Sequence, residues 1–135
     1  MFKKILIANR GEVAVRVARA AAELGVPTVT VYSVDDAASA HVAAGDTAVA
    51  LGGAGPSAYL NADNILAIAA EQGCDAIHPG YGFLSENASF AAGCKAAGIC
   101  FIGPNVEALN VFGDKGQARQ IALKCDVPVP QGTDG

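Results

Sequence analysis

Residues 77–87, Ile77-His78-Pro79-Gly80-Tyr81-Gly82-Phe83-Leu84-Ser85-Glu86-Asn87, form the stretch from which the fold can be argued. The apolar residues just before it are typical of a short buried strand. Pro79 ends that strand because proline has no N–H to donate to a neighbouring strand. Gly80 and Gly82 allow backbone angles and close approaches that other residues forbid. The stretch therefore predicts a strand that runs through a crowded turn into a helix.

The turn supplies the first candidate site. Ser85 and Asn87 can each accept a hydrogen bond from a free N–H at the start of the following helix. A polar turn at the carboxyl end of a parallel strand is where open α/β sheets bind their ligands. Tyr81, Gly82 and Glu86 are therefore candidate binding residues. The alternative is a purely structural turn in which Tyr81 covers the core.

Composition and charge narrow the class of protein. The chain has 135 residues, enough for one domain, and 52% of them are hydrophobic. Its net charge of −4 and the lack of a basic cluster argue against a nucleic-acid partner. No apolar run is long enough to span a membrane, and Asn9-Arg10 interrupts the only segment that resembles a secretion signal. We expect a cytoplasmic protein with neither a nucleic-acid nor a membrane partner.

The cysteines indicate reduced thiols rather than a metal site. They are scattered, without a C-x-x-C pair, and the chain has only two histidines. A zinc site needs a closer set of ligands. The four positions are Cys74, Cys94, Cys100 and Cys125.

Apolar runs alternate with helical patterns along the first hundred residues. This alternation predicts an α/β fold: a doubly wound, mainly parallel five-stranded sheet with helices on both faces. A short helix at 39–44 would carry His41, as a surface or packing residue. Strands are expected at 3–8, 27–33, 47–51, 74–77 and 99–102, and helices at 12–24, 61–72 and 88–97.

The pattern changes after residue 104. Two helices are expected at 105–111 and 114–125, followed by an extended Val127–Pro130 in which proline forbids helix. We therefore divide the chain into a domain at 1–104 and a helical linker at 105–135 that leads into an absent domain.

The first helix carries four charged residues at spacings of four, three and four, which fall in one stripe. One interpretation is a solvated face with ion pairs between neighbouring turns. The other is a subunit contact, in which the stripe meets its own copy across a two-fold axis. The residues are Glu12, Arg16, Arg19 and Glu23.

A dinucleotide-binding domain is one alternative function. Asp35 and Asp36 follow the second predicted strand, where such a domain would bind a ribose. The first turn, however, has a single glycine, Gly11, instead of G-x-G-x-x-G, which weakens the case for NAD. A non-catalytic association module built on the charged helix is the second alternative.

Four sequence blocks together resemble the amino-terminal part of biotin carboxylase. They are Ile7-Ala8-Asn9-Arg10-Gly11-Glu12, the block 78–87, Phe101-Ile102-Gly103-Pro104 and Gly113-Asp114-Lys115. The likeness covers essentially the whole chain. It extends to the matching parts of acetyl-, propionyl- and longer-chain acyl-CoA carboxylases, pyruvate carboxylase and urea carboxylase. The resemblance implies a Rossmann-like pre-ATP-grasp domain that precedes an ATP-grasp domain.

The resemblance also implies an activity and a set of site residues. The family uses MgATP and bicarbonate to carboxylate biotin on a carrier protein, so ATP, Mg²⁺ and biotin are the implied cofactors. Lys115 matches the lysine that contacts ATP. Tyr81 and Gly82 match the turn that forms one wall of the biotin site, with Glu86 as a secondary candidate.

Partners and limits follow from the same resemblance. Arg16, Arg19 and Glu23 match positions at the family's dimer contact, which favours a homodimer. A biotin carboxyl carrier domain and a carboxyltransferase component are the implied partners. Residues 124–132 depart from the family's usual linker pattern. No magnesium carboxylate or catalytic base can be assigned here, so we expect this chain alone to be inactive as an ATP-dependent ligase.

Overall fold

The computed structural model describes residues 1–130 and contains one parallel sheet of five short strands. The spatial order is β3-β2-β1-β4-β5, and all four neighbouring pairs run parallel. The predicted α/β fold is therefore confirmed, although each strand is shorter than its apolar run. The strands are β1 (Ile5–Ile7), β2 (Thr28–Tyr32), β3 (Thr47–Ala50), β4 (Ala76–His78) and β5 (Cys100–Phe101).

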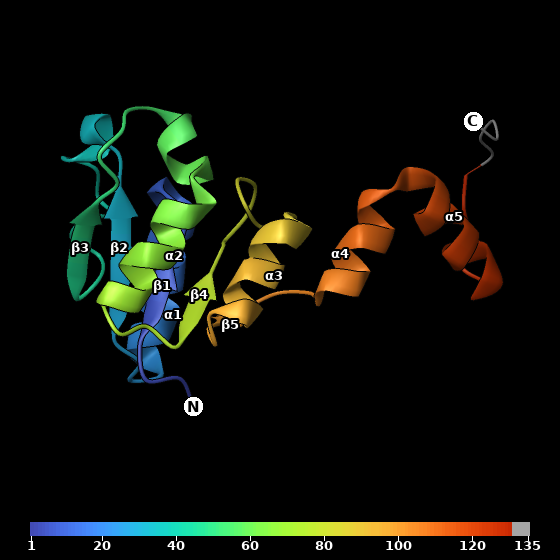
Figure 1. Cartoon of the computed structure of the whole chain (residues 1–135), viewed down its shortest axis with the longest axis horizontal. Coiled ribbons are helices and arrows are strands. Elements are labelled where there is room, and N and C mark those ends of the chain that lie inside the picture. Colours follow the sequence, from blue (N-terminus) through green and yellow to red (C-terminus); the bar gives the residue numbers. More distant parts are fainter. Residues whose placement is uncertain (131–135) are drawn as a thin grey trace.

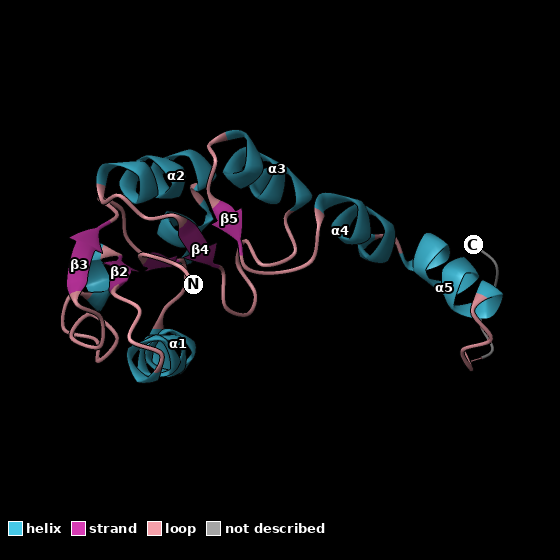
Figure 2. Cartoon of the chain, turned by 90° about the horizontal axis from the view of Figure 1, so that it is seen from below, coloured by secondary structure: helices cyan, strands magenta, loops and turns pink. Residues whose placement is uncertain are grey.

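Helices cover both faces of this sheet, as the sequence predicted. Figure 2 shows α1 on one face and α2 and α3 on the other. Two 3₁₀ turns, η1 (Val34–Asp36) and η2 (Pro56–Leu60), follow β2 and β3. The helices are α1 (Gly11–Glu23), α2 (Ala62–Glu71), α3 (Ala88–Ala96), α4 (Val106–Gly113) and α5 (Lys115–Lys124).

The larger part of the core lies between the sheet and the pair α2 and α3. Leu6, Ile77 and Phe90 are buried there, and Tyr59 is completely buried beside them. The opposite face is thinner, because α1 presents small side chains to β1. Ile7 packs there against Ala14 and Ala18.

Asparagine side chains cap two of the predicted helices. The side-chain oxygen of Asn61 accepts a hydrogen bond from Asn64 at the start of α2. Asn87 accepts one from Phe90 at the start of α3, at 2.8 Å. Ser85, the other capping candidate, lies in the turn before the N-cap and is not the capping residue.

The predicted short helix at 39–44 is wrong. The chain makes successive turns here. The N–H of Val42 donates to the carbonyl of Ser39, and the N–H of Ala44 donates to the carbonyl of His41. The His41 ring is buried, and its Nε2 pairs with the carbonyl of Val31 at 3.2 Å. His41 is thus a packing residue that ties this loop to β2.

The last two helices lead away from the sheet (Figure 1). α4 contacts α3 and α5, and Leu109 is its buried residue, while α5 has none. Phe112 and Gly113, expected to separate the helices, belong to the end of α4. The last five residues of the predicted linker lie outside the described part of the chain. No helix within residues 1–130 is both long and apolar enough to cross a membrane.

Candidate functional site

The candidate site begins where the sheet changes direction. The chain passes from β1 to β2 on one side, and β4 is added on the other side of β1. The carboxyl ends of β1 and β4 are therefore the topological switch point, where open α/β sheets place their ligands. The segment after β1 begins with Asn9-Arg10, and the segment after β4 is the turn at 79–83.

The side chain of Asn9 joins these two segments. Its Nδ2 donates to the carbonyl oxygen of Pro79 at 2.8 Å and to that of Tyr81 at 2.9 Å. Its Oδ1 accepts a hydrogen bond from the backbone N–H of Arg10 at 2.9 Å. Asn9 is only 2% exposed. The amide therefore uses both of its N–H groups on the turn and its oxygen on its own strand end.

The turn itself has an unusual backbone. Gly80, Gly82 and Phe83 have φ values of 67°, 69° and 47°. A Cβ at Gly80 would lie 2.6 Å from Nδ2 of Asn9, so only glycine fits there. The left-handed conformation costs a residue with a side chain about 1–2 kcal/mol, so Phe83 is strained. Such strain clusters at functional sites.

The Phe83 ring packs against a buried tyrosine. Its centroid lies 5.3 Å from that of Tyr59, with the planes inclined by 42°. Leu84, the next residue, is 2% exposed. The turn is thus fixed at one end by Asn9 and at the other by this aromatic contact.

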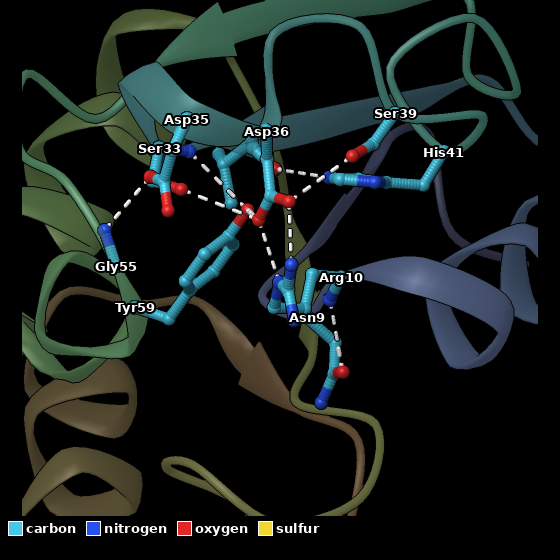
Figure 3. A network of polar contacts seen from close by, with 10 residues as sticks. Asn9, Arg10, Ser33, Asp35, Asp36, Ser39, His41, Gly55 and Tyr59 are labelled. Atoms are coloured by element: carbon cyan, nitrogen blue, oxygen red, sulfur yellow. Dashed lines mark hydrogen bonds and ion pairs between the residues drawn. The ribbon is translucent and has the colours of Figure 1, made fainter.

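An ion pair beside the turn joins β1 to β2 (Figure 3). Nε of Arg10 donates to Oδ2 of Asp36 at 2.6 Å, and Nη2 donates to Oδ1. The hydroxyl of Tyr59 donates to Oδ2 at 2.8 Å. Ser33 and Ser39 donate to the same carboxylate, at 3.2 and 3.0 Å. The carboxylate is therefore saturated with donors.

The pKa values of the pair follow from this arrangement. The hydrogen bond from Arg10 holds the pKa of Asp36 well below its usual range, although burial acts in the opposite direction. The same bond raises the pKa of Arg10. Burial raises the pKa of the Tyr59 hydroxyl, so it stays a donor.

These contacts bear on the dinucleotide alternative. Both oxygens of Asp36 are occupied within the protein, and Oδ1 of Asp35 accepts the backbone N–H of Gly55 at 2.8 Å (Figure 3). The acidic residues at the end of β2 are thus committed to the fold, and the first turn keeps its single glycine. The structure gives this alternative no support.

A cleft of about 620 Å³ lies beside the turn, at the carboxyl ends of β4 and β5. Lys115, the first residue of α5, and Glu86 both line it, so the structure brings these two predicted residues together. Tyr81 does not line the cleft; it projects from the adjoining turn and is 84% exposed. The other lining residues are Pro79, Gly80, Ser85, Ile102, Gly103, Pro104, Ala108, Leu109, Phe112 and Gly113.

His78 supports the turn from below. Its Nδ1 accepts the backbone N–H of Gly80 at 3.0 Å, which requires that this nitrogen carry no proton. Burial lowers the pKa of His78 and favours the same neutral form. The histidine therefore shapes the backbone of the turn.

The charged stripe on α1 lies apart from the cleft residues. Glu12, Arg16, Arg19 and Glu23 are all exposed, and none forms an ion pair within residues 1–130. Beside them, α1 and the amino terminus form an apolar groove of about 480 Å³, which Arg16 also lines. The ion pairs of the first interpretation are therefore not formed.

Sequence reasoning missed the four residues that hold the turn, which we call the frame: Asn9, Arg10, Asp36 and Tyr59. Asn9 and Arg10 were noted as an interruption of an apolar segment and as part of a block, and Asp36 as a ribose ligand, while Tyr59 was not singled out. The signal in the sequence was an amide and a cation at the end of the first strand, followed by an acid at the end of the second. The part of the chain that the structure describes holds no group of three or more His, Cys, Asp or Glu that could bind a metal ion.

Comparisons with known proteins agree on one family. Residues 1–109 match the family model described as biotin carboxylase, N-terminal domain. The chain is 53% identical to a pyruvate carboxylase from Staphylococcus aureus over 98% of its own length and 12% of that protein.

Solved structures give the same result. The biotin carboxylase domain of a single-chain bacterial carboxylase superposes with a TM-score of 0.93 at 53% identity, over 96% of this chain and 30% of that one. The biotin carboxylase domain dimer of 2-oxoglutarate carboxylase from Hydrogenobacter thermophilus, solved with MgADP, ADP and bicarbonate, gives 0.96 at 46% identity, over 100% and 30%. The chain thus spans less than a third of each of these proteins.

Proposed function

Since this chain belongs to the family of biotin carboxylase N-terminal domains, we propose that it is the first part of a longer enzyme that carboxylates biotin with MgATP and bicarbonate. The enzyme is an ATP-dependent ligase in which residues 1–104 form the pre-ATP-grasp domain. Residues 105–135 link this domain to the ATP-grasp domain. One wall of the catalytic cleft is formed by this chain, and the facing wall by the following domain.

One observation carries the proposal. Lys115 lines a single cleft together with Gly80 and Glu86, although Lys115 begins α5 and the other two lie in the connection between β4 and α3. The cleft lies at the carboxyl ends of two parallel strands. A cation and a tyrosine-bearing turn at this edge are what a phosphate-containing substrate and a flat ring system require of one wall.

Lys115 is proposed to contact ATP. A lysine reaches a phosphate oxygen as a point charge at the end of a flexible chain. Asp114 fixes the start of α5 by accepting the backbone N–H of Gln117 at 2.9 Å, which holds the Lys115 backbone at the rim of the cleft. The described residues hold no metal cluster, so Mg²⁺ would be bound by groups outside residues 1–130.

The turn at Tyr81 and Gly82 is proposed to form one wall of the biotin site. The exposed ring of Tyr81 offers an apolar surface to a bicyclic ligand, and Gly82 lets the ligand approach the backbone. Glu86 lines the adjacent cleft and is placed to orient polar groups of the substrate.

We further propose that the parent enzyme is a cytoplasmic or organellar homodimer that pairs through Arg16, Arg19 and Glu23. Its partners are a biotin carboxyl carrier domain and a carboxyltransferase component. The acceptor of the carboxyl group is selected by that component. Two similar relatives support a role in such an enzyme: a pyruvate carboxylase at 53% identity, and a 2-oxoglutarate carboxylase at 46% identity whose biotin carboxylase domain was solved as a dimer.

The proposal is tested by ATP kinetics of the full-length carboxylase that contains this chain. Lys115→Ala is expected to raise the KM for ATP by about tenfold or more, because a charge-assisted contact to phosphate contributes roughly 1.5–3 kcal/mol. Lys124→Ala, at the other end of the same helix, is the matched control and should leave that KM unchanged. Equal KM values for the two variants would contradict the role of Lys115.

The isolated chain offers a second test. Incubated with MgATP, bicarbonate and free biotin, it should release no ADP above background, because one cation without metal ligands cannot support phosphoryl transfer. Turnover by the chain alone would refute the division of the active site between two domains.

A further inference from the structure

We propose that Asn9 is the positioning residue of the turn at 79–83 and sets how the biotin wall faces its ligand. The inference rests on the proposed function, in which Tyr81 and Gly82 form that wall. Asn9 itself does not line the cleft, but it bonds to Pro79, which does. Its effect passes through the backbone of the turn.

Hydrogen bonds hold the amide of Asn9 in one orientation. Both Nδ2 protons of Asn9 are used on carbonyl oxygens of the turn, on Pro79 at 2.8 Å and on Tyr81 at 2.9 Å. The bond from Arg10 to Oδ1 fixes which end of the amide faces the turn. A reversed amide would point its oxygen at two carbonyl oxygens. Asn9 therefore has one orientation, and it fixes the residues on both sides of Gly80.

The backbone at Gly80 lies too close to Asn9 to leave room for a side chain. A Cβ at Gly80 would approach Nδ2 of Asn9 to 2.6 Å and Cγ1 of Val13 to 2.8 Å. The backbone thus lies directly against the amide, and any shift of the turn toward β1 is blocked. The residue that follows, Tyr81, is 84% exposed, so little packing holds its side chain. Asn9 holds the backbone from which this side chain projects, through the carbonyl oxygen of Tyr81.

The residues next to Asn9 are themselves linked by hydrogen bonds and packing. Arg10, the neighbour of Asn9, donates two hydrogen bonds to Asp36, and Asp36 accepts a third from the hydroxyl of Tyr59. Tyr59 in turn packs on Phe83 at the far end of the same turn. Figure 3 shows the contacts of Arg10 and Tyr59 with Asp36, and the bonds of Asn9 and the ring of Phe83 connect these residues to the strained turn after β4. Such a frame can hold a wall in place without contact with the substrate.

The test is the kinetics of the full-length carboxylase with free biotin, followed as the biotin-dependent release of ADP. Asn9→Ala should raise the KM for biotin by about tenfold to a hundredfold, as misplacement of a binding group by an ångström does, with the KM for ATP unchanged. A merely structural role would lower the amount of active enzyme and leave both KM values alone. Equal biotin KM values for Asn9→Ala and the unmodified enzyme would overturn the inference.

Asn64→Ala is the matched control. Asn64 makes the same kind of contact elsewhere, with its Nδ2 donating to the carbonyl of Leu51 at 3.0 Å. Loss of that contact should leave both KM values unchanged. If Asn9→Ala does not fold, Asn9→Ser, which keeps one donor, replaces it and should give a smaller rise in the KM for biotin alone.

Tyr81→Ala separates the inference from the proposed function. If Tyr81→Ala raises the biotin KM and Asn9→Ala does not, the wall is real and Asn9 does not position it. If Tyr81→Ala has no effect on the biotin KM, the proposed biotin wall itself is wrong, whatever Asn9 does.

Discussion

The guanidinium of Arg10, just after β1, donates a hydrogen bond to each carboxylate oxygen of Asp36, in the 3₁₀ turn after β2. The contact fixes the separation of the carboxyl ends of β1 and β2, next to the candidate site. The Asp36 side chain is 6% exposed and that of Arg10 44% exposed, so the pair is half open to solvent.

Loss of the carboxylate should destabilise the chain. Asp36→Asn removes the charge and leaves donors of Arg10, Tyr59, Ser33 and Ser39 short of acceptors. We expect the free energy of unfolding to fall by about 2 kcal/mol, because buried donors lose their partner while solvent screens the exposed part of Arg10. Urea unfolding at pH 7 measures the change. An unaltered midpoint would show that the pair contributes nothing.

The same pair gives a pH dependence. The pKa of Asp36 is lowered by folding, so its contribution is fully present above the unfolded pKa of about 4 and is lost as the pH falls below it. Arg10 stays protonated throughout because its pKa is raised. The difference in unfolding free energy between the unmodified chain and Asp36→Asn should therefore shrink below about pH 4. A constant difference from pH 7 to pH 3 would contradict the assigned cause.

The two glycines of the turn should respond differently to alanine. Both have φ near 70°, but a Cβ at Gly80 meets Asn9 at 2.6 Å, whereas one at Gly82 meets nothing within 4 Å. Gly82→Ala should cost only the backbone strain, about 1–2 kcal/mol. Gly80→Ala should cost clearly more, by thermal or urea unfolding. Equal losses would show that the turn can move away from Asn9.

The tyrosine of the frame can be probed without loss of its ring. Tyr59→Phe removes a hydroxyl that donates to Asp36 at 2.8 Å and accepts the backbone N–H of Ser33 at 3.2 Å. We expect a loss of about 1–3 kcal/mol, since a buried N–H is left without its acceptor. Tyr59→Leu, which also removes the contact with Phe83, should lose more. A Phe variant as stable as the unmodified chain would mean that water replaces the hydroxyl.

The charged stripe of α1 predicts how copies pair. Arg19→Glu turns the stripe from balanced to strongly acidic, so two copies should repel each other. Sedimentation of the full-length carboxylase should show a dimer for the unmodified protein and a shift toward monomer for the variant. Lys95→Glu, an equal charge change at the end of α3, is the control. Dimers of undiminished strength in Arg19→Glu would place the interface elsewhere.

Local patterns predicted the sheet because each element carries its own signal. β1 is a run of three fully apolar residues, and Gly25 and Gly73 come two residues after the last residues of α1 and α2. The cap at Asn61 is likewise a contact over three residues. Such features depend on neighbours in the sequence, so a reader of the sequence can find them.

The frame around the turn could not be found in that way. Asn9 reaches Tyr81 across 72 positions, and Arg10 reaches Asp36 across 26. No spacing rule joins residues so far apart until the strand order is known. The prediction of a helix at 39–44 failed for a similar reason. The burial of His41 against β2 overrides the helical preference of the alanines in this segment.

The central place of β1 also orders events during synthesis. β1 emerges first from the ribosome, yet one of its two neighbours, β4, begins only at Ala76. At roughly 5–20 residues per second, β1 waits about 4–14 seconds for that neighbour. Until then the edge of β1 that pairs with β4 and the Nδ2 protons of Asn9 have no native partner, so the nascent chain exposes an unpaired strand edge during this interval.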